Sequence, residues 1–287
     1  MKPSTRARIQ LAASMAIWGT LAPFVRNISV SSGELALYRA ILATLMIGIF
    51  LLVTHQRIHL KALGKDLPLL LFSGIAMGFN WILLFEAYQY TTVSVATLSY
   101  YFAPVIVTLV CPILFKERLS KKQLLCFLMS TLGLTLVIGI TDLGSGGNNV
   151  LGILFGLGAA VLYATVVLLN KFIQGVGGIH RTFLQFLAAI VILIPYVAFS
   201  GGVTLNTLNA TGWIYLLIVG IVHTGITYCL YFTSLKDLPG QTAAILSYID
   251  PLVAILTAVV ILKEPLTLPQ IIGGSLILGF TLWNELT

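Results

Sequence analysis

The stretch Leu98–Gln123, LSYYFAPVIVTLVCPILFKERLSKKQ, returns later in the chain at Ile245–Gln270 as ILSYIDPLVAILTAVVILKEPLTLPQ. Most positions of this ungapped overlay keep the same residue or exchange one apolar residue for another. A recurrence of this kind indicates an internal repeat, which has to be recognised before a fold is assigned. The identical pairs are Tyr101/Tyr248, Pro104/Pro251, Leu109/Leu256, Lys116/Lys263, Glu117/Glu264, Leu119/Leu266 and Gln123/Gln270.

The two copies differ in charge immediately after their shared Lys-Glu pair. The first copy continues with the cations Arg118, Lys121 and Lys122, whereas the second copy has no cation at the matching positions. If the repeats are membrane helices, the two corners should lie on opposite sides, because Lys and Arg accumulate on the cytoplasmic side. This difference indicates an inverted-topology repeat.

The composition indicates a membrane protein. Of the 287 residues, 58% are hydrophobic and 9% are charged, whereas a soluble domain has about 25% charged residues. The net charge of +7 comes from cations in short gaps between apolar runs, not from the basic, aromatic-interleaved patch of a nucleic-acid-binding protein. The three cysteines lie inside apolar runs without the spacing of a metal or redox site, so no metal is expected.

Ten apolar segments are long enough to cross a bilayer, which takes about 20 residues. The gaps between them are short, so we expect one all-α transmembrane bundle without a soluble domain, and we read the first segment as a retained helix and not a signal peptide. The segments are approximately 9–27, 33–54, 67–89, 93–115, 121–141, 150–172, 180–199, 211–233, 240–262 and 267–285.

The boundary between the repeats is predicted in the Gly-rich loop 142–149. Residues 1–141 then form one five-helix repeat, and residues 150–287 form a second, inverted one, because five is an odd number. With the N-terminus inside, 13 of the 16 Lys and Arg residues are cytoplasmic and three are not, whereas the opposite orientation reverses these numbers. We therefore expect both termini in the cytoplasm of a multi-pass protein in the plasma membrane, which is the inner membrane in a Gram-negative cell.

The chain resembles the EamA family of the drug/metabolite transporter superfamily over its whole length. The similarity rests on AIWGT at 16–20, Arg39 early in the second helix, the mid-helix prolines Pro104 and Pro251, and the KExLxxxQ corners at 116–123 and 263–270. The resemblance implies ten helices around a central cavity, alternating access, and small metabolites, often amino acids, as substrates.

Several polar and aromatic residues from different helices are expected near the bilayer midplane, as judged from the helical rise of 1.5 Å per residue. Inverted-repeat transporters bind their substrates in this layer. Pro104 and Pro251 are the candidate hinges, because an interior proline frees a backbone carbonyl and bends a helix. The candidate substrate-binding residues are Trp18, Asn80, Trp81, Glu86, Tyr101, Tyr163, His223, Tyr228, Tyr248 and Asp250.

Asp250 is the most informative of these candidates. A carboxylate at the bilayer centre is costly, so it should face a cavity or a partner. It either takes part in substrate binding or proton coupling, or it is a structural acid at a bent helix. Glu86 lies beside several tyrosines, which suits an ammonium group through cation–π attraction, or it reaches headgroup water from an aromatic belt.

Three further features can each be explained by a structural role. His223 could carry a proton or be a satisfied buried histidine beside the polar stripe Thr224, Thr227, Tyr228 and Tyr231, whose hydroxyls could also join helices. Arg39 and Glu34 are expected to pair at the outer end of their helix, which would leave no basic residue in the midplane layer. The two Lys-Glu corners are expected to anchor helix ends.

The sequence predicts a transporter and not an enzyme, since no nucleotide, metalloprotease or hydrolase motif is present. We expect secondary active or facilitative transport of a small polar metabolite, an amino acid or related compound, exported by alternating access. The alternative is uptake of a cationic or quaternary amine such as choline, and a remote alternative is an intramembrane enzyme or receptor.

The expected partners are the substrate and the lipid bilayer, without nucleic acid. No cofactor is expected, although proton or ion coupling is possible, and monomer and homodimer remain open.

Overall fold

Every regular element in the described residues of the computed structural model is a helix. The structure describes residues 3–56, 64–115, 120–138, 148–173, 176–235, 238, 246–247 and 249–285. Two short 3₁₀ turns, η1 (Gly64–Asp66) and η2 (Leu205–Thr207), lie between helices. The helices are α1 (Pro3–Gly19), α2 (Leu21–Arg26), α3 (Ser32–Val53), α5 (Leu67–Tyr90), α6 (Val93–Tyr100), α7 (Ala103–Phe115), α8 (Lys121–Ile138), α10 (Asn148–Phe172), α11 (Gly178–Phe199), α12 (Ala210–Leu217), the π-helical η3 (Ile218–Ile226), α13 (Thr227–Leu235), α15 (Ile249–Val260) and α16 (Leu268–Glu285).

The observed helices follow the apolar segments expected from the sequence. Helices α3, α5, α10 and α11 begin and end close to the predicted segments, and α12, η3 and α13 together fill the segment 211–233. Within the described residues, five helices are long and apolar enough to cross a membrane, and four apolar helices are shorter. The five are Ser32–Val53, Leu67–Tyr90, Asn148–Asn170, Gly178–Phe199 and Ala210–Tyr231.

Two of the predicted segments are broken helices. The segment 9–27 consists of α1 and α2, which are separated at Thr20, and the segment 93–115 consists of α6 and α7, which are separated at Tyr101 and Phe102. Pro104 is the second residue of α7, and Pro251 is the third residue of α15. In the first turn of a helix a proline loses no helical hydrogen bond, since the first amides have no partner within the helix. Pro104 therefore starts a helix, whereas Pro251 follows the helical residues 246–247 and residue 248, which lies outside the described residues.

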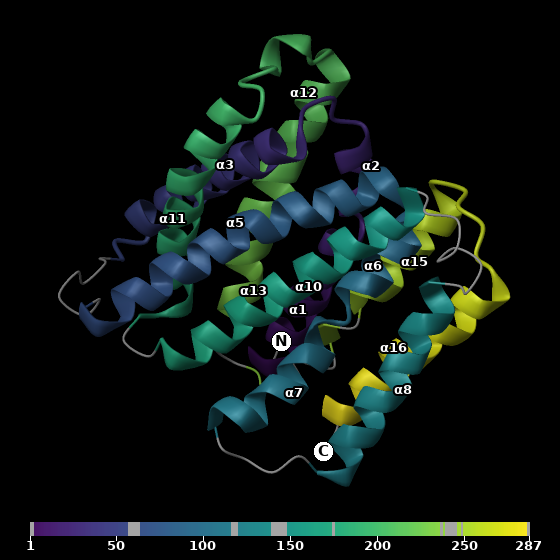
Figure 1. Ribbon diagram of the computed structural model, residues 1–287. Coiled ribbons are helices and arrows are strands. Elements are labelled where there is room, and N and C mark those ends of the chain that lie inside the picture. Colours follow the sequence, from purple (N-terminus) through teal and green to yellow (C-terminus); the bar gives the residue numbers. More distant parts are fainter. Residues whose placement is uncertain are drawn as a thin grey trace.

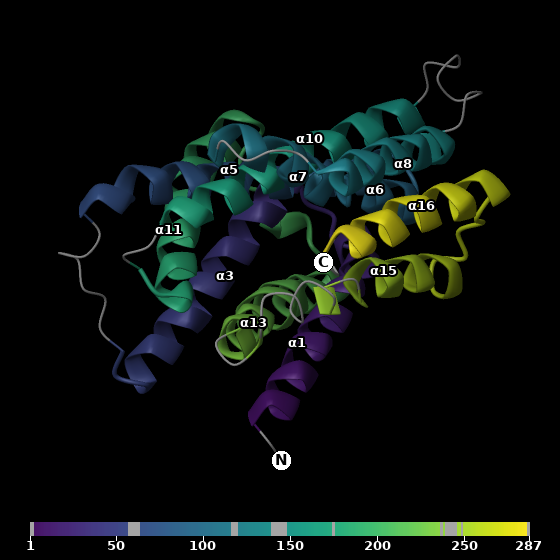
Figure 2. The same cartoon turned by 90° about the horizontal axis from the view of Figure 1, so that it is seen from below.

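The two halves of the chain are interlocked. In Figure 1, α3 and α11 lie at one end of the bundle, α8 and α16 lie side by side at the other end, and α5 and α10 run between them. Figure 2 shows α1 with α13 and α15 on the side away from α5 and α10. The most extensive packing always joins a helix of residues 1–141 to a helix of residues 150–287. The hydrophobic clusters of the described residues therefore draw on both halves.

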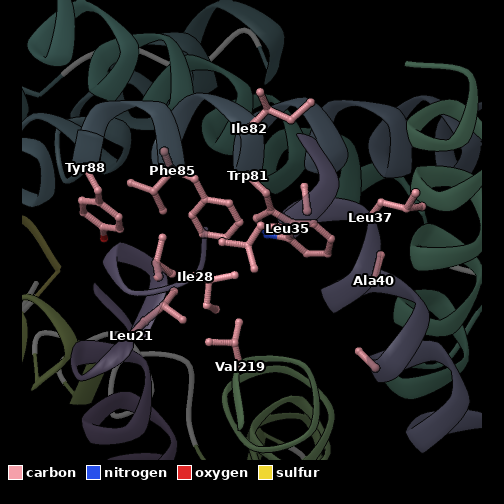
Figure 3. Packing of buried hydrophobic residues seen from close by; sticks show 14 of the residues in the cluster. Leu21, Ile28, Leu35, Leu37, Ala40, Trp81, Ile82, Phe85, Tyr88 and Val219 are labelled. Carbon is pink, nitrogen blue, oxygen red and sulfur yellow. The ribbon is translucent and has the colours of Figure 1, made fainter. Parts of the chain in front are cut away.

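A large part of that core lies between α3, α5, α11 and η3. Trp81 and Phe85 of α5 point from one side toward α3, and Val219 of η3 approaches from the other side (Figure 3). Helix backbones come close where side chains are small, as is common between membrane helices. A Cβ at Gly133 of α8 would lie 2.6 Å from the carbonyl oxygen of Gly273 in α16. The contact between α8 and α16 therefore requires glycine at this position.

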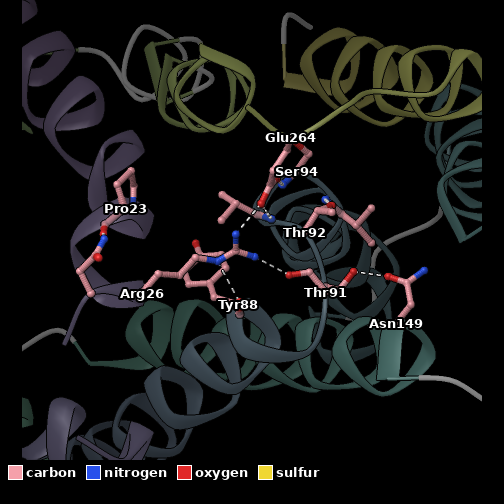
Figure 4. A network of polar contacts seen from close by, with 11 residues as sticks. Pro23, Arg26, Tyr88, Thr91, Thr92, Ser94, Asn149 and Glu264 are labelled. Atoms are coloured by element: carbon pink, nitrogen blue, oxygen red, sulfur yellow. Dashed lines mark hydrogen bonds and ion pairs between the residues drawn. The ribbon is translucent and has the colours of Figure 1, made fainter. Parts of the chain in front are cut away.

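An ion pair between Arg26 and Glu264 fastens several helix ends together (Figure 4). Arg26 Nη1 lies 2.6 Å from Glu264 Oε1, and the carboxylate also accepts from the amides of Val93 and Ser94 at 3.0 and 3.3 Å. These amides open α6, where a negative charge is favourable. The other nitrogens of Arg26 donate to carbonyls at the end of α5, namely Tyr88 O at 3.0 Å and Thr91 O at 2.7 Å. We call this set of contacts the Glu264 clamp.

The clamp agrees with the expectation that the second Lys-Glu corner anchors a helix end, and Glu264 carries that role. Lys263 is exposed and has a left-handed backbone with φ of 57°. The first corner, Lys116-Glu117, lies outside the described residues.

Replacing Glu264 by Ala is expected to destabilise the fold. The change leaves Arg26 without its carboxylate and the first amides of α6 without an acceptor. Because Arg26 is 27% exposed, the expected loss is about 2 kcal/mol, toward the lower end of the range for a buried pair. Reversible unfolding in detergent micelles measures it. The exposed neighbour provides the control, since Lys263→Ala should change stability by less than about 0.5 kcal/mol. Equal stability of both variants would contradict the role of the clamp.

Candidate functional site

The helix break between α6 and α7 meets Asp250 of α15 inside the bundle. The hydroxyl of Tyr101, at this break, donates to Asp250 Oδ2 at 2.6 Å. Asp250 belongs to the first turn of α15 and is half-buried. Its second oxygen, Oδ1, receives no hydrogen bond from the described residues.

Helix α1 approaches this acid closely because residue 19 is a glycine. A Cβ at Gly19 would lie 2.7 Å from the carbonyl oxygen of Asp250 and 2.6 Å from Cβ of Val253. The glycine therefore sets the distance between α1 and α15 and, with it, the position of the acid.

Aromatic side chains from four helices surround Asp250. The ring centroid of Tyr100 lies 5.8 Å from that of Tyr101 and 5.4 Å from that of Tyr163 on α10. Across the bundle, Trp18 of α1 packs on Tyr228 of α13 at 5.0 Å. The charge of Asp250 acts on Tyr100, Tyr163 and Tyr228. We call this group the tyrosine site: Trp18, Tyr100, Tyr101, Tyr163, Tyr228 and Asp250.

The tyrosine site has accessible surface within the bundle. Tyr163 keeps 40% of its surface accessible, although its ring borders Tyr100 and it interacts electrostatically with Tyr228 and Tyr231 on a different helix. The other members of the site are half-buried. The arrangement offers aromatic faces beside one carboxylate, that of Asp250.

Asn80 and Trp81 lie deeper in the helix packing than this site. Asn80 is 4% exposed, and its Nδ2 donates to the carbonyl of Ala159 at 2.6 Å, which joins α5 to α10. Trp81 is also 4% exposed and packs edge-on against Phe186 of α11, with ring centroids 5.2 Å apart. The amide donor of Asn80 is thus already used within the protein.

His223 lies in the π-helical stretch η3 and is 2% exposed. Its Nε2 lies 3.1 Å from Thr20 Oγ1, its Nδ1 lies 3.4 Å from the carbonyl of Ile218, and its ring packs on Phe24. Thr20 donates its own proton to the carbonyl of Ile17, so its oxygen is free to accept from the imidazole. A neutral imidazole donates through one nitrogen only, so it can serve either Thr20 or the carbonyl of Ile218, and both readings of His223 stay open.

Glu86 is a further predicted residue that is not joined to the tyrosine site. Glu86 is half-buried on α5, and no ion pair or hydrogen bond links it to any of the described residues. Tyr248 lies outside the described residues, so its place remains a prediction. The structure brings together Trp18, Tyr101, Tyr163, Tyr228 and Asp250, and adds Tyr100, which the sequence had placed only among the tyrosines near Glu86.

The expected pairing of Glu34 with Arg39 is wrong. Glu34 accepts from the amide of Thr204 at 2.6 Å, from the hydroxyl of Tyr38 at 3.0 Å and from Ser31. It therefore caps its own helix and holds the loop before α12. Arg39 is 3% exposed and lies one-third of the way along α3, where its Nε donates to Thr224 Oγ1 at 3.0 Å.

Arg39 is therefore a cation inside the bundle, whereas the expectation that the midplane layer lacks a cation stays a prediction. The Arg39 guanidinium carbon lies 4.6 Å from the ring centroid of Trp81 and 5.4 Å from that of Phe85. An arginine eight residues into an apolar helix is a signal that sequence reasoning could have used, since such charges face the interior of a bundle.

The chain is similar to known transporters along its whole length. A model described as the EamA-like transporter family matches residues 6–139 and again residues 150–284. The uncharacterized transporter YxxF of Bacillus subtilis (strain 168) is 34% identical over 257 residues, covering 88% of this chain and 81% of that protein. An uncharacterized transporter of Archaeoglobus fulgidus is 30% identical over 278 residues, covering 95% of this chain and 94% of that protein.

A more distant relative and a solved structure are also similar to this chain. Protein PecM of Dickeya dadantii (strain 3937) is 26% identical over 269 residues, covering 90% of this chain and 84% of that protein. A solved crystal structure superposes with a TM-score of 0.69 at 16% identity and covers 98% of this chain and 97% of its own. The likeness to that structure concerns the fold alone.

The Gly19→Ala substitution is expected to destabilise the protein. The added methyl group would overlap the carbonyl of Asp250 and the side chain of Val253, and overpacking of this kind costs about 1–3 kcal/mol. Unfolding in detergent measures the change. Gly279 of α16 has open space around its missing Cβ, so Gly279→Ala should be neutral or should stabilise by up to about 1 kcal/mol. A Gly19→Ala protein as stable as wild type would show that α1 and α15 are not tightly packed.

Proposed function

Because this chain belongs to the EamA-like transporter family, it is a small-molecule transporter of the membrane and not an enzyme, and we propose that it moves its substrate by alternating access around the tyrosine site. The substrate is a small polar metabolite, an amino acid or related compound, and the direction is export. Transport is secondary active or facilitative and needs no cofactor.

The hydrogen bond between Tyr101 and Asp250 carries this proposal. A carboxylate at the bilayer centre costs about 2.5–3.5 kcal/mol on insertion scales. Its position among aromatic side chains, with Oδ2 bonded to Tyr101, suits a group that exchanges protein partners for substrate or for a proton. Substrate sites of inverted-repeat transporters are formed by discontinuous helices near the midplane, and Tyr101 lies at such an interruption.

The proposal includes ten membrane spans, arranged as two inverted repeats with both termini in the cytoplasm of the plasma membrane. Three observations support it. The family model matches each half separately. Helix α1 packs on α13 and α15 as α10 packs on α5 and α6, so the contacts of one half have counterparts in the other. The Lys and Arg residues also accumulate in the gaps assigned to the cytoplasm.

In this mechanism, the chain bends at the breaks before α7 and around Pro251, and the helices on either side rock about the substrate. The Glu264 clamp holds α2, the end of α5 and the start of α6 at one end of the bundle. Opening of the tyrosine site toward that end therefore requires the clamp to break. Proton coupling through Asp250 would use the same oxygen that meets the substrate.

Transport by protein reconstituted into liposomes tests the proposal. Asp250→Asn and Tyr101→Phe should each lower the transport rate at least tenfold, because the first removes the charge and the second removes the donor that orients it. The matched control is Tyr196→Phe, since Tyr196 is 36% exposed on α11 and far along the chain from the breaks. Normal transport by both site variants in folded protein would show that the substrate passes elsewhere.

The alternative is uptake of a cationic or quaternary amine such as choline, which Asp250 and the tyrosine faces would also suit through charge and cation–π attraction. A competition experiment distinguishes the amine from the amino acid as the substrate. Inhibition of transport by tetramethylammonium and choline, with no effect of amino acids, would favour the amine. Inhibition by zwitterionic amino acids alone would favour the amino acid.

A further inference from the structure

The π-helical stretch η3 frees the backbone carbonyl of His223 from the amide that would bond to it in an α-helix. That amide belongs to Thr227, four residues later in the chain. In the structure the amide of Thr227 bonds instead to the carbonyls of Val222 and Thr224 and passes over that of His223. Inside a membrane bundle such a carbonyl needs a partner from elsewhere in the protein.

Trp18 of α1 supplies this partner. Its Nε1 donates to the carbonyl of His223 at 2.7 Å. An indole has one donor and no acceptor, so this bond fixes how the ring is turned. The ring packs on Tyr228 and Tyr231 of α13, with centroids 5.0 and 5.3 Å apart. The carbonyl of His223 therefore determines how Trp18 lies in the tyrosine site.

The packing of η3 on α3 supports the π geometry. A Cβ at Gly220 would lie 2.7 Å from Cβ of Leu42. A Cβ at Gly225 would lie 2.7 Å from Cγ of Met46, so both glycines face α3. In an α-helix, residues five apart are turned about 140° from each other, and the two glycines would not share this face. The wider π turn, which closes between residues five apart, brings them together on it.

Hydroxyl groups of the stretch follow the same five-residue spacing. Thr224 Oγ1 donates to the carbonyl of Val219 at 2.8 Å, and Thr227 Oγ1 donates to the carbonyl of Val222 at 2.6 Å. In an α-helix a threonine hydroxyl reaches a carbonyl three or four residues back. Side chains as well as the backbone thus bond η3 as a π-helix, and π-helical turns are frequent at functional sites.

We propose that the π-helical geometry of η3 positions Trp18 in the tyrosine site, through the carbonyl of His223, and that transport depends on this bond. The inference rests on the proposed function, because the tyrosine site is the site that it serves. A carbonyl outside the helical ladder can tilt toward a donor on a neighbouring helix, whereas a carbonyl within the ladder is held along the helix axis. The stretch η3 acts through Trp18 and is a positioning element.

Deletion of Ile221 is the variant that tests this inference, because it shortens η3 by one residue and lets the stretch close as an α-helix. Gly220 and Gly225 are then four residues apart and still share the face toward α3. His223 remains four residues before Thr227, so the amide of Thr227 can bond to the carbonyl of His223. The deletion thus removes the π geometry and keeps the packing on α3.

Nuclear magnetic resonance of the full chain in micelles, labelled with ¹⁵N-tryptophan, reports on the bond directly. The chain has four tryptophans, and the indole signal of Trp18 is the one that Trp18→Phe removes. In the deletion variant we expect this N–H to move upfield and to exchange with water at least tenfold faster, because it loses its acceptor. An unchanged Trp18 signal in the folded deletion variant would overturn the inference.

Transport kinetics in liposomes distinguish a positioning role from a merely structural one. The probes are a radiolabelled mixture of amino acids and radiolabelled choline. For the probe that the wild-type protein transports, Trp18→Phe and the deletion of Ile221 should each raise the half-saturation concentration at least fivefold. The double variant should be no worse than either single variant, because both changes remove the same bond. Additive effects would show that the deletion does not act through Trp18 and would contradict the inference.

Trp213→Phe is the matched control for the tryptophan substitution. Trp213 lies on α12 and is 42% exposed, so this variant should transport as the wild-type protein does. If the deletion variant does not fold, histidine labelled with ¹³C at the carbonyl decides. The carbonyl signal of His223 should shift in Trp18→Phe and stay unchanged in Trp213→Phe, and an unchanged signal in both variants would refute the bond.

The outcomes separate this inference from the proposed function. If Asp250→Asn and Tyr101→Phe lose transport while Trp18→Phe transports normally, the proposed function remains and this inference fails. If Trp18→Phe and the deletion of Ile221 impair transport while Asp250→Asn and Tyr101→Phe do not, the positioning of Trp18 remains and the proposed role of Asp250 fails.

Discussion

In hydrocarbon, every backbone polar group needs a partner within the protein, and the broken helices of this bundle depend on that constraint. Helix α6 starts and stops inside the fold, so its ends need partners from elsewhere. Glu264 supplies acceptors for the amides of Val93 and Ser94 at the start. At the other end, the amides of Tyr101 and Phe102 still bond to carbonyls of α6, namely those of Thr97 and Ser99. The break is thus satisfied, and it leaves the Tyr101 side chain directed at Asp250.

Two charges inside the bundle give the interior its chemical character. Asp250 is oriented by one phenol and approached closely by α1 because of Gly19. Arg39 is oriented by one hydroxyl and one indole ring. They lie on separate helices from opposite halves of the chain.

Much of the fold could be predicted because the length and the hydrophobic pattern of a segment indicate whether water or lipid surrounds it. The long apolar runs became α3, α5, α10 and α11 nearly at the predicted bounds. The breaks were harder to predict from the sequence: Pro104 was expected to bend a helix in its middle, whereas it lies in the first turn of α7. The π-helical geometry of η3 was missed, because no residue pattern in Ile218–Ile226 distinguishes it from an α-helix of the same composition.

The sequence by itself determined that the chain is a membrane protein and that a few polar residues had to lie inside it, since composition and the cost of buried charge are properties of the residues alone. It also predicted two related halves, from the repetition. Only the tertiary structure decided which of these residues meet. Asp250 pairs with Tyr101, which is 149 positions away in the chain. Arg39 turns to Thr224 instead of the nearby Glu34. The physical reason is that partner choice depends on how helices from the two halves pack, and side-chain spacing along one helix does not contain that information.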